Sequence, residues 1–218
     1  MLRYFTVNTV AELVCFIIAV IYLSKQQDKV WKSFILFLLL TVIAEMAGIH
    51  IKKVFHQPNA WVYNLLLIAQ ASFLLSMFRH LLYSAKKAPL IVIGAVLVGV
   101  VYIYETVNNR FYNPEVNARY FYNNLTNTVL SVMVVFYSLF YFYTLLKSDE
   151  YVVLSRSGEF WWVAGALFFY FGASACNLFY SAFAKNYIST YYIYNVLNLV
   201  LYSCWSYAII CKRWAYPS

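Results

Sequence analysis

Apolar residues fill most of the chain in seven long runs, and short polar stretches separate these runs. Each run is about 20 residues long, the length that an α-helix needs to cross the hydrocarbon core of a bilayer. The runs do not alternate apolar and polar residues, as the strands of a membrane barrel would. We therefore predict an all-α polytopic membrane protein, with helices over residues 5–24, 32–51, 60–83, 88–105, 121–147, 160–183 and 187–211.

The composition leaves little material for a domain outside the membrane. Hydrophobic residues make up 64% of the chain and charged residues 11%, against about 25% charged in soluble domains. We expect one seven-helix bundle over residues 1–218, without proline kinks, because no proline lies in the interior of a predicted helix: three fall outside the helices and Pro89 is in the first turn of residues 88–105. Small residues predict that another helix packs closely against the sixth span: Gly165, Ala166, Gly172, Ala173 and Cys176.

The distribution of positive charge predicts the orientation of the bundle. With the N-terminus outside, ten basic residues face the cytoplasm: Lys25, Lys29, Lys32, Arg79, Lys86, Lys87, Lys147, Arg156, Lys212 and Arg213. Six basic residues then face outward: Arg3, Lys52, Lys53, Arg110, Arg119 and Lys185. This excess on the inner side favours an N-out, C-in topology. The net charge of +8 indicates contact with anionic headgroups of the bilayer, and no clustered basic face suits a nucleic acid.

Spans one to three can be aligned on spans five to seven, which indicates either an internal repeat or a chance likeness between apolar sequences. The two halves cover residues 5–83 and 121–211, with residues 88–105 as a linker helix. Parallel repeats of this kind recur in transporters, and the 3+1+3 topology resembles that of SWEET and PQ-loop transporters. The chain lacks their Pro-Gln dipeptide and their helix prolines. The alignment pairs Asn8-Thr9-Val10 with Asn127-Thr128-Val129, Trp31 with Trp162, Tyr63-Asn64 with Tyr194-Asn195, and Ser72 with Ser203.

Polar side chains at membrane depth provide the candidate binding site, because such residues are costly in lipid and often functional. In the N-out topology most of them fall in the outer half of the bundle or near its midplane. We predict an outward-facing ligand pocket lined by Asn8, Glu12, Glu45, Asn64, Gln70, Asn127, Asn195, Asn198 and Tyr202. The alternative is that the amides form hydrogen bonds between helices and bind nothing. For Glu12 and Glu45 we favour a functional role, because an unpaired buried carboxylate is a poor structural choice.

Several tyrosines also lie deep within the predicted spans. A buried phenol needs a hydrogen-bond partner. We therefore expect partners inside the bundle for Tyr137, Tyr141, Tyr143 and Tyr170.

The lysines, histidines and serines of this chain do not fit the known chemistries of seven-span proteins. The last predicted span has no lysine for a retinal Schiff base. His50 and His56 lie at the outer end of the second span, and His80 lies at the inner end of the third, about 30 Å away, so one metal site cannot hold all three histidines. A metal held by His50 and His56 with Glu45 or Glu105 is the weaker alternative. No serine has an intramembrane base beside it, so we expect no enzyme activity, no metal and no cofactor.

Some features of the chain resemble small seven-span proteins of Bacteroidota-type bacteria, most of which have no assigned function. These features are Glu45 in span two, residues 59–64 opening span three, Phe160-Trp161-Trp162 opening span six, and the asparagines of span seven. Such proteins resemble the membrane halves of sensory kinases. The resemblance implies a multi-pass protein of the bacterial inner membrane.

Two functional hypotheses follow from these patterns. In the first, the protein is a receptor or sensor that binds a small or amphiphilic ligand in the outer pocket and signals to a membrane or cytoplasmic partner protein. In the second, it is a small-solute transporter with Glu12 or Glu45 as proton carrier. A transporter needs a hydrated inner path and helix breaks, which the sequence lacks, so the receptor is favoured. A structural or assembly subunit is the third alternative.

Overall fold

The computed structural model describes residues 6–83, 88–111, 121–147, 153–178 and 190–215. All regular structure in these residues is helical, and each predicted span overlaps one α-helix. The α-helices are α1 (Val7–Leu23), α2 (Lys29–Val54), α3 (Ala60–Leu81), α4 (Ala88–Phe111), α5 (Asn124–Lys147), α6 (Gly158–Leu178) and α8 (Thr190–Ala215). A short 3-10 turn, η3, covers Leu154–Arg156.

Five of these helices, α2, α3, α4, α5 and α8, are long and apolar enough to cross a membrane. The 17-residue α1 is apolar but shorter. The predicted class is confirmed at this level, since several helices of one chain meet the length and hydropathy of a span. The protein is a multi-pass helical membrane protein.

The helix ends differ from the predicted ones where a capping side chain decides them. The predicted start of the second span at residue 32 is wrong by three residues, because the Asp28 carboxylate accepts a hydrogen bond from the Val30 amide at 3.0 Å and α2 begins at Lys29. The Ser157 hydroxyl caps α6 in the same way, through the Phe160 amide at 3.2 Å. Helix α4 continues beyond the predicted end at residue 105 to Phe111. Residues 179–183 and 187–189 of the last two predicted spans lie outside the described residues.

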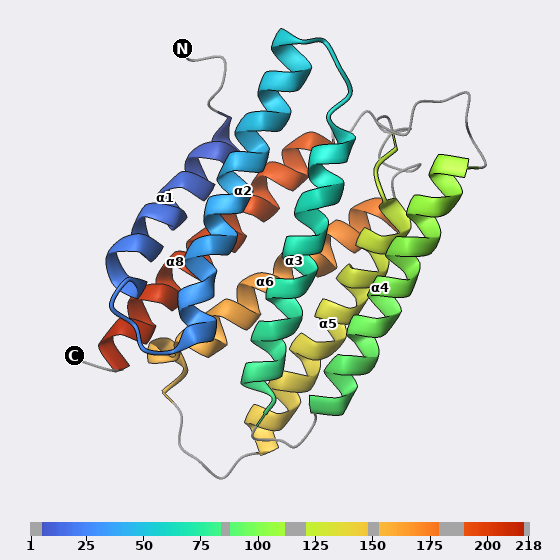
Figure 1. The fold of residues 1–218 in the computed structure, drawn as a ribbon. Helices are drawn as coiled ribbons and strands as arrows, with labels where there is room; N and C mark the ends of the chain where they lie inside the picture. The colour runs from blue at the N-terminus through green and yellow to red at the C-terminus, as the bar shows by residue number, and fades with distance from the viewer. Residues whose placement is uncertain (1–5, 84–87, 112–120, 148–152, 179–189, 216–218) are drawn as a thin grey trace.

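Six helices form two packed layers (Figure 1). Helices α1, α2 and α3 make one layer, and α8, α6 and α5 make the other. The layers meet where α1 packs on α8 and where α3 packs on α5. Helix α4 lies outside this ring, against α5 and α3. We call the end where α1 begins and α2 ends the upper end, and the opposite end the lower end.

The closest helix contact joins α6 and α8 through glycines. A Cβ atom added at Gly165 would lie 2.7 Å from the Cβ of Cys204, and one added at Gly158 would lie 2.7 Å from the backbone oxygen of Ala208. Small residues let helix backbones approach each other in membranes. The predicted role of the small residues in the sixth span is therefore confirmed at Gly165.

We expect Gly165→Val to destabilise the bundle by about 1–3 kcal/mol, because the added atoms overlap α8 in a packed contact. Gly99→Ala is the matched control, since a Cβ at Gly99 meets nothing within 4 Å and alanine favours the helix by up to ~1 kcal/mol. Thermal unfolding of the purified variants in detergent measures both effects. Equal melting temperatures for the two variants would contradict the close α6–α8 contact.

Candidate functional site

The carboxyl groups of Glu12 on α1, which is buried, and Glu45 on α2, which is half-buried, form the centre of the candidate site in the upper half of the bundle. Glu12 is 6% exposed, and its Oε1 accepts a hydrogen bond from the Tyr202 hydroxyl at 3.3 Å. The Tyr63 hydroxyl donates to Glu45 Oε2 at 3.0 Å. The two carboxyl groups lie near enough for their charges to interact. Four helices, α1, α2, α3 and α8, thus bring two acids and two phenols together.

A glycine and an asparagine position Tyr63 against α2. A Cβ atom at Gly48 would lie 2.7 Å from the Tyr63 hydroxyl oxygen, so only glycine leaves this ring its place. The Asn59 side-chain amide donates to the Gly48 carbonyl at 3.0 Å, which holds the start of α3 on the same turn of α2. The Tyr63–Glu45 hydrogen bond therefore depends on close packing of α2 and α3.

A second group of polar side chains surrounds a pocket between α3, α5, α6 and α8, with a cavity volume of about 280 Å³. Gln70 Nε2 donates to the hydroxyl of Tyr170, across the two layers. Tyr170 also lies near Tyr202, whose hydroxyl donates to Glu12. The lining residues are Gln70, Tyr122, Asn124, Asn127, Ser131, Phe169, Tyr170, Ala173 and Tyr194.

We call the two acids and their neighbours the upper polar cluster, made up of Glu12, Glu45, Tyr63, Gln70, Tyr170 and Tyr202.

Several oxygen atoms in the upper half of the bundle are buried and have no hydrogen-bond partner among the described residues. They are Asn8 Oδ1, Glu12 Oε2, Ser174 Oγ and Asn195 Oδ1. An unsatisfied buried polar atom costs about 1–3 kcal/mol, so such atoms indicate where water or a ligand binds.

The remaining predicted site residues divide between the pocket and the scaffold. Asn127 lines the pocket, whereas the half-buried Asn198 lies on α8 one turn after Asn195. Asn64 forms hydrogen bonds with backbone: its amide donates to the Phe121 carbonyl at 2.8 Å, and its Oδ1 accepts from the Asn123 amide at 2.9 Å. Asn64 thus joins α3 to the start of α5. This is the alternative role given above for the amides, a hydrogen bond within the bundle in place of a bond to a ligand.

Sequence reasoning left several tyrosines out of the predicted site. Tyr63 lies two helical turns before Gln70, so the spacing places both on one face of α3, although Tyr63 was not among the predicted pocket residues. Tyr170 was expected to need a partner, and Gln70 supplies it. The Tyr137 hydroxyl likewise donates to the Leu90 carbonyl at 3.1 Å. By contrast, Tyr143 is 58% exposed on the outside of α5.

An inner aromatic layer closes the bundle below the upper polar cluster. It consists of Phe34, Phe37, Phe73, Phe78, Trp162 and Trp205, from α2, α3, α6 and α8. The rings of Phe37 and Phe73 stack at 4.4 Å, and those of Trp162 and Trp205 at 5.9 Å. Tyr202 contacts Trp205 edge to face, with ring centroids 5.8 Å apart. Because Tyr202 also donates to Glu12, it joins the upper polar cluster to this layer.

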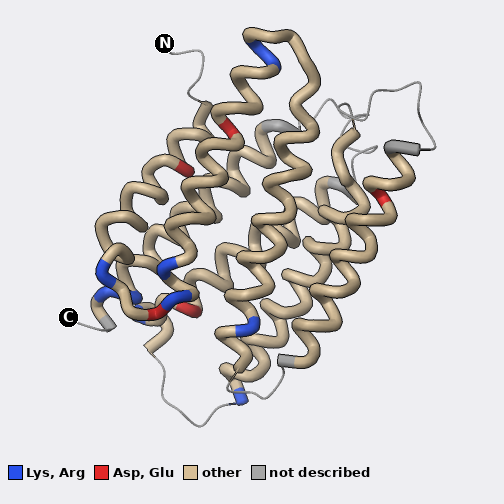
Figure 2. Tube along the Cα trace, in the orientation of Figure 1, with Lys and Arg blue, Asp and Glu red and all other residues tan. Residues whose placement is uncertain are grey.

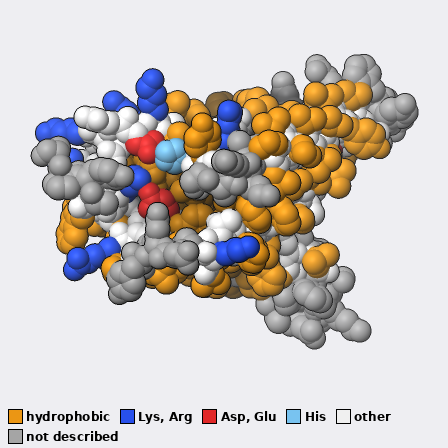
Figure 3. All heavy atoms as spheres, turned by 90° about the horizontal axis from the view of Figure 1, so that it is seen from below, with side chains coloured by type: hydrophobic (Ala, Val, Ile, Leu, Met, Phe, Trp, Pro, Cys, Tyr) orange, Lys and Arg blue, Asp and Glu red, His pale blue; other side chains and the backbone are white. Residues whose placement is uncertain are grey.

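The lower end carries most of the described charge (Figure 2). Seen from below, Lys and Arg side chains surround Asp, Glu and His side chains on one part of this face, and hydrophobic side chains cover the flank (Figure 3). Lys212 Nζ lies 2.6 Å from Glu159, and His80 Nε2 lies 3.0 Å from Asp28. These pairs join α8 to α6 and α3 to the start of α2.

Glu105 has a structural role at the upper end of the bundle, near the end of α4. Its carboxylate accepts hydrogen bonds from the backbone amides of Leu125 and Thr126, at 2.9 and 2.8 Å, and so caps α5 from the neighbouring α4. The weaker alternative, a metal held with this carboxylate, is not seen: the described residues contain no group of three metal-binding side chains.

We expect Tyr202→Phe to lower the free energy of unfolding by about 1–3 kcal/mol, because the variant leaves a buried Glu12 oxygen without its donor. Tyr207→Phe is the control on the same helix, since its hydroxyl donates to the Ser155 carbonyl on the exposed surface at 3.0 Å. Chemical unfolding in detergent compares the two. A loss no larger for Tyr202→Phe than for Tyr207→Phe would contradict a buried Glu12–Tyr202 pair.

The comparisons with known proteins add no identity to this geometry. No family model, no curated protein and no solved structure matches the chain. The features that bear on function are therefore the upper polar cluster, its unsatisfied oxygen atoms and the inner aromatic layer.

Proposed function

We propose that the protein is a membrane receptor or sensor that binds a small polar or amphiphilic ligand at the upper polar cluster. The observation that carries this proposal is the group of buried oxygen atoms without partners, which includes Glu12 Oε2 and Asn195 Oδ1. A purely structural network would satisfy these atoms within the bundle. A bound ligand would satisfy them instead.

The chemistry of the cluster favours a ligand with N–H or O–H donors. Carboxylate and amide oxygens accept hydrogen bonds, and the cluster has two carboxyl groups but no lysine or arginine among its members. A protonated amine or a polyhydroxyl compound has the matching donors. An apolar groove between α1 and α8, with Tyr202 among its lining residues, gives an amphiphilic ligand a place for its hydrophobic part.

The inner aromatic layer supports a receptor more than a channel or an open carrier. It separates the upper polar cluster from the lower end with packed rings from four helices. Tyr202 contacts this layer directly, so a ligand that displaces Tyr202 from Glu12 would shift Trp205. The basic residues at the lower end would meet an acidic surface of a partner protein or the headgroups of the bilayer.

For the membrane topology we propose seven spans with the N-terminus outside and the C-terminus in the cytoplasm of a bacterium. The basic residues at the start of α2 and in the last turns of α3, α5 and α8 support this orientation, and Figure 2 shows the blue segments gathered at the lower end. Lys52 and Lys53, at the upper end of α2, are the exceptions.

The topology predicts that a fluorescent protein fused after Ser218 fluoresces, because it would fold in the cytoplasm. Alkaline phosphatase fused at the same position should be inactive, since it needs the oxidising periplasm. Fusions of both reporters after Gln57, between α2 and α3, should give the opposite pattern. An active phosphatase at residue 218 would contradict the proposed orientation.

A small-solute transporter is the second candidate, and the arrangement of helices favours it. The contacts of α1, α2 and α3 with one another repeat in those of α5, α6 and α8, and each half touches the other through its first and last helix. That pattern fits the predicted 3+1+3 repeat, with Glu12 or Glu45 as proton carrier.

One experiment on purified protein separates the two candidates. We expect a panel of amines, polyols and lipids to contain a compound that raises the melting temperature of the wild type, and Glu12→Gln or Glu45→Gln to reduce that shift at least several-fold. Glu159→Gln is the control, because this acid belongs to the lower ion pair with Lys212 and should leave the ligand-dependent shift unchanged.

The same protein in liposomes gives the second measurement. Binding without flux across the membrane, with or without a pH gradient, supports the receptor. Gradient-dependent uptake that Glu12→Gln or Glu45→Gln abolishes would overturn the receptor and establish the transporter. If no compound stabilises the protein and none is transported, both candidates fail and an assembly role is left.

A further inference from the structure

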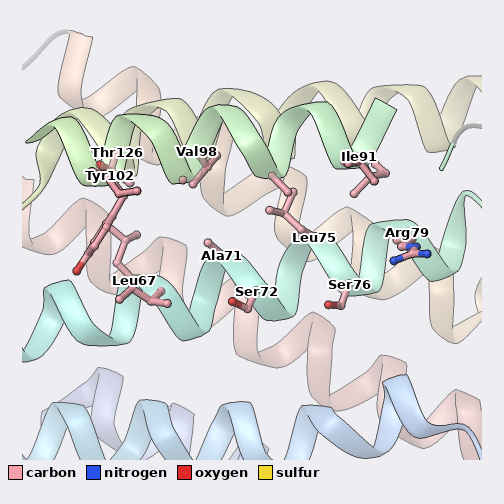
Figure 4. A pocket seen from close by; sticks show the side chains of 15 residues that line it. Leu67, Ala71, Ser72, Leu75, Ser76, Arg79, Ile91, Val98, Tyr102 and Thr126 are labelled. Carbon is pink, nitrogen blue, oxygen red and sulfur yellow. The ribbon is translucent and has the colours of Figure 1, made fainter. Parts of the chain in front are cut away.

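A surface pocket lies on the outside of the bundle, between α3 and α4. The two helices diverge there around a groove with a cavity volume of about 530 Å³ (Figure 4), within the ~300–1,000 Å³ of ordinary ligand pockets. Small residues on both helices create the space: Ala71, Ser72, Ala95 and Gly99. Because α4 packs outside the ring of six helices, the groove faces the lipid rather than the upper polar cluster.

The length of the groove matches one leaflet of a bilayer. Its lining on α3 runs from Leu67 to Arg79, a distance of about 18 Å along the helix axis at 1.5 Å per residue. Half of the ~30 Å hydrocarbon core is about 15 Å. An acyl chain lying along α3 would therefore fill the groove from the headgroup level to the midplane.

The lower end of the groove carries a positive charge. Arg79 lies there beside the start of α4, while the rest of the lining is mainly apolar (Figure 4). Arg79 is exposed and forms no ion pair within the part of the chain that the structure describes. The described acids of the lower end are already paired: Asp28 with His80, and Glu159 with Lys212.

An arginine at the headgroup level is suited to a phosphate, because its guanidinium donates two parallel hydrogen bonds to such an anion. A free phosphate would not need the apolar part of the groove, and a peptide helix would need more width than one acyl chain. We propose that the α3–α4 groove binds one anionic phospholipid, with an acyl chain between the helices and its phosphate on Arg79.

The first test compares headgroups on purified protein in detergent. Dioleoyl phosphatidylglycerol should raise the melting temperature at lower concentration than dioleoyl phosphatidylcholine, and Arg79→Ala should weaken the phosphatidylglycerol effect roughly three- to tenfold. Arg156→Ala is the control, because it removes the same charge from the lower end at η3, outside the groove. Equal losses in the two variants would show a diffuse charge effect and overturn the site.

The second test fills the groove without disturbing the fold. A Cβ atom at Gly99 meets nothing within 4 Å, so Gly99→Leu should leave the melting temperature in detergent unchanged or higher while its side chain occupies the acyl site. Native mass spectrometry counts bound lipids. We expect one retained phosphatidylglycerol per wild-type chain and none on Gly99→Leu; retention by that variant would contradict the proposal. Ligand binding at the upper polar cluster is not involved in either test.

Discussion

The hydrocarbon of a bilayer offers no hydrogen-bond partner, and this constraint sorts the polar residues of the bundle. Serine and threonine in the spans meet it locally: Thr41, Ser131 and Ser138 donate to the carbonyl one turn earlier in their own helix. A glutamate cannot do the same, because a carboxylate needs donors. Glu12 and Glu45 therefore depend on tyrosines from α8 and α3. The residues that cannot be satisfied within one helix are the ones that define the candidate site.

The helices could be predicted from the sequence because membrane thickness and helix rise together set the length of an apolar run. Their ends could not, since a cap is a local contact: Asp28 begins α2 before the apolar run starts. The hydrogen-bond partners of the polar side chains could not be predicted from the sequence pattern either. Asn64 and Gln70 look alike in sequence, yet one bonds with backbone near α5 and the other with a buried phenol. Only the packing of α3 against two different neighbours separates these roles.

The glycine contacts between α6 and α8 limit how the bundle can change shape. Two helices whose backbones touch over several turns move as one body, because sliding would bring Cβ atoms into each other. A rearrangement at the upper polar cluster is more easily accommodated where α8 meets α1, since the Glu12–Tyr202 hydrogen bond and the α1–α8 groove both lie at that joint. Binding at Glu12 would thus act on the contact between α1 and the rigid pair of α6 and α8.

The parallel indoles of Trp162 and Trp205 have a practical consequence. Their ring centroids are 5.9 Å apart and their planes are within 4° of parallel, and the Trp205 Nε1 donates to the Trp162 carbonyl at 3.1 Å. Two chromophores held so close share their excited state, which makes the near-ultraviolet circular dichroism of the protein sensitive to their mutual angle. The unmodified chain therefore has a built-in optical probe at the junction between its polar and aromatic halves.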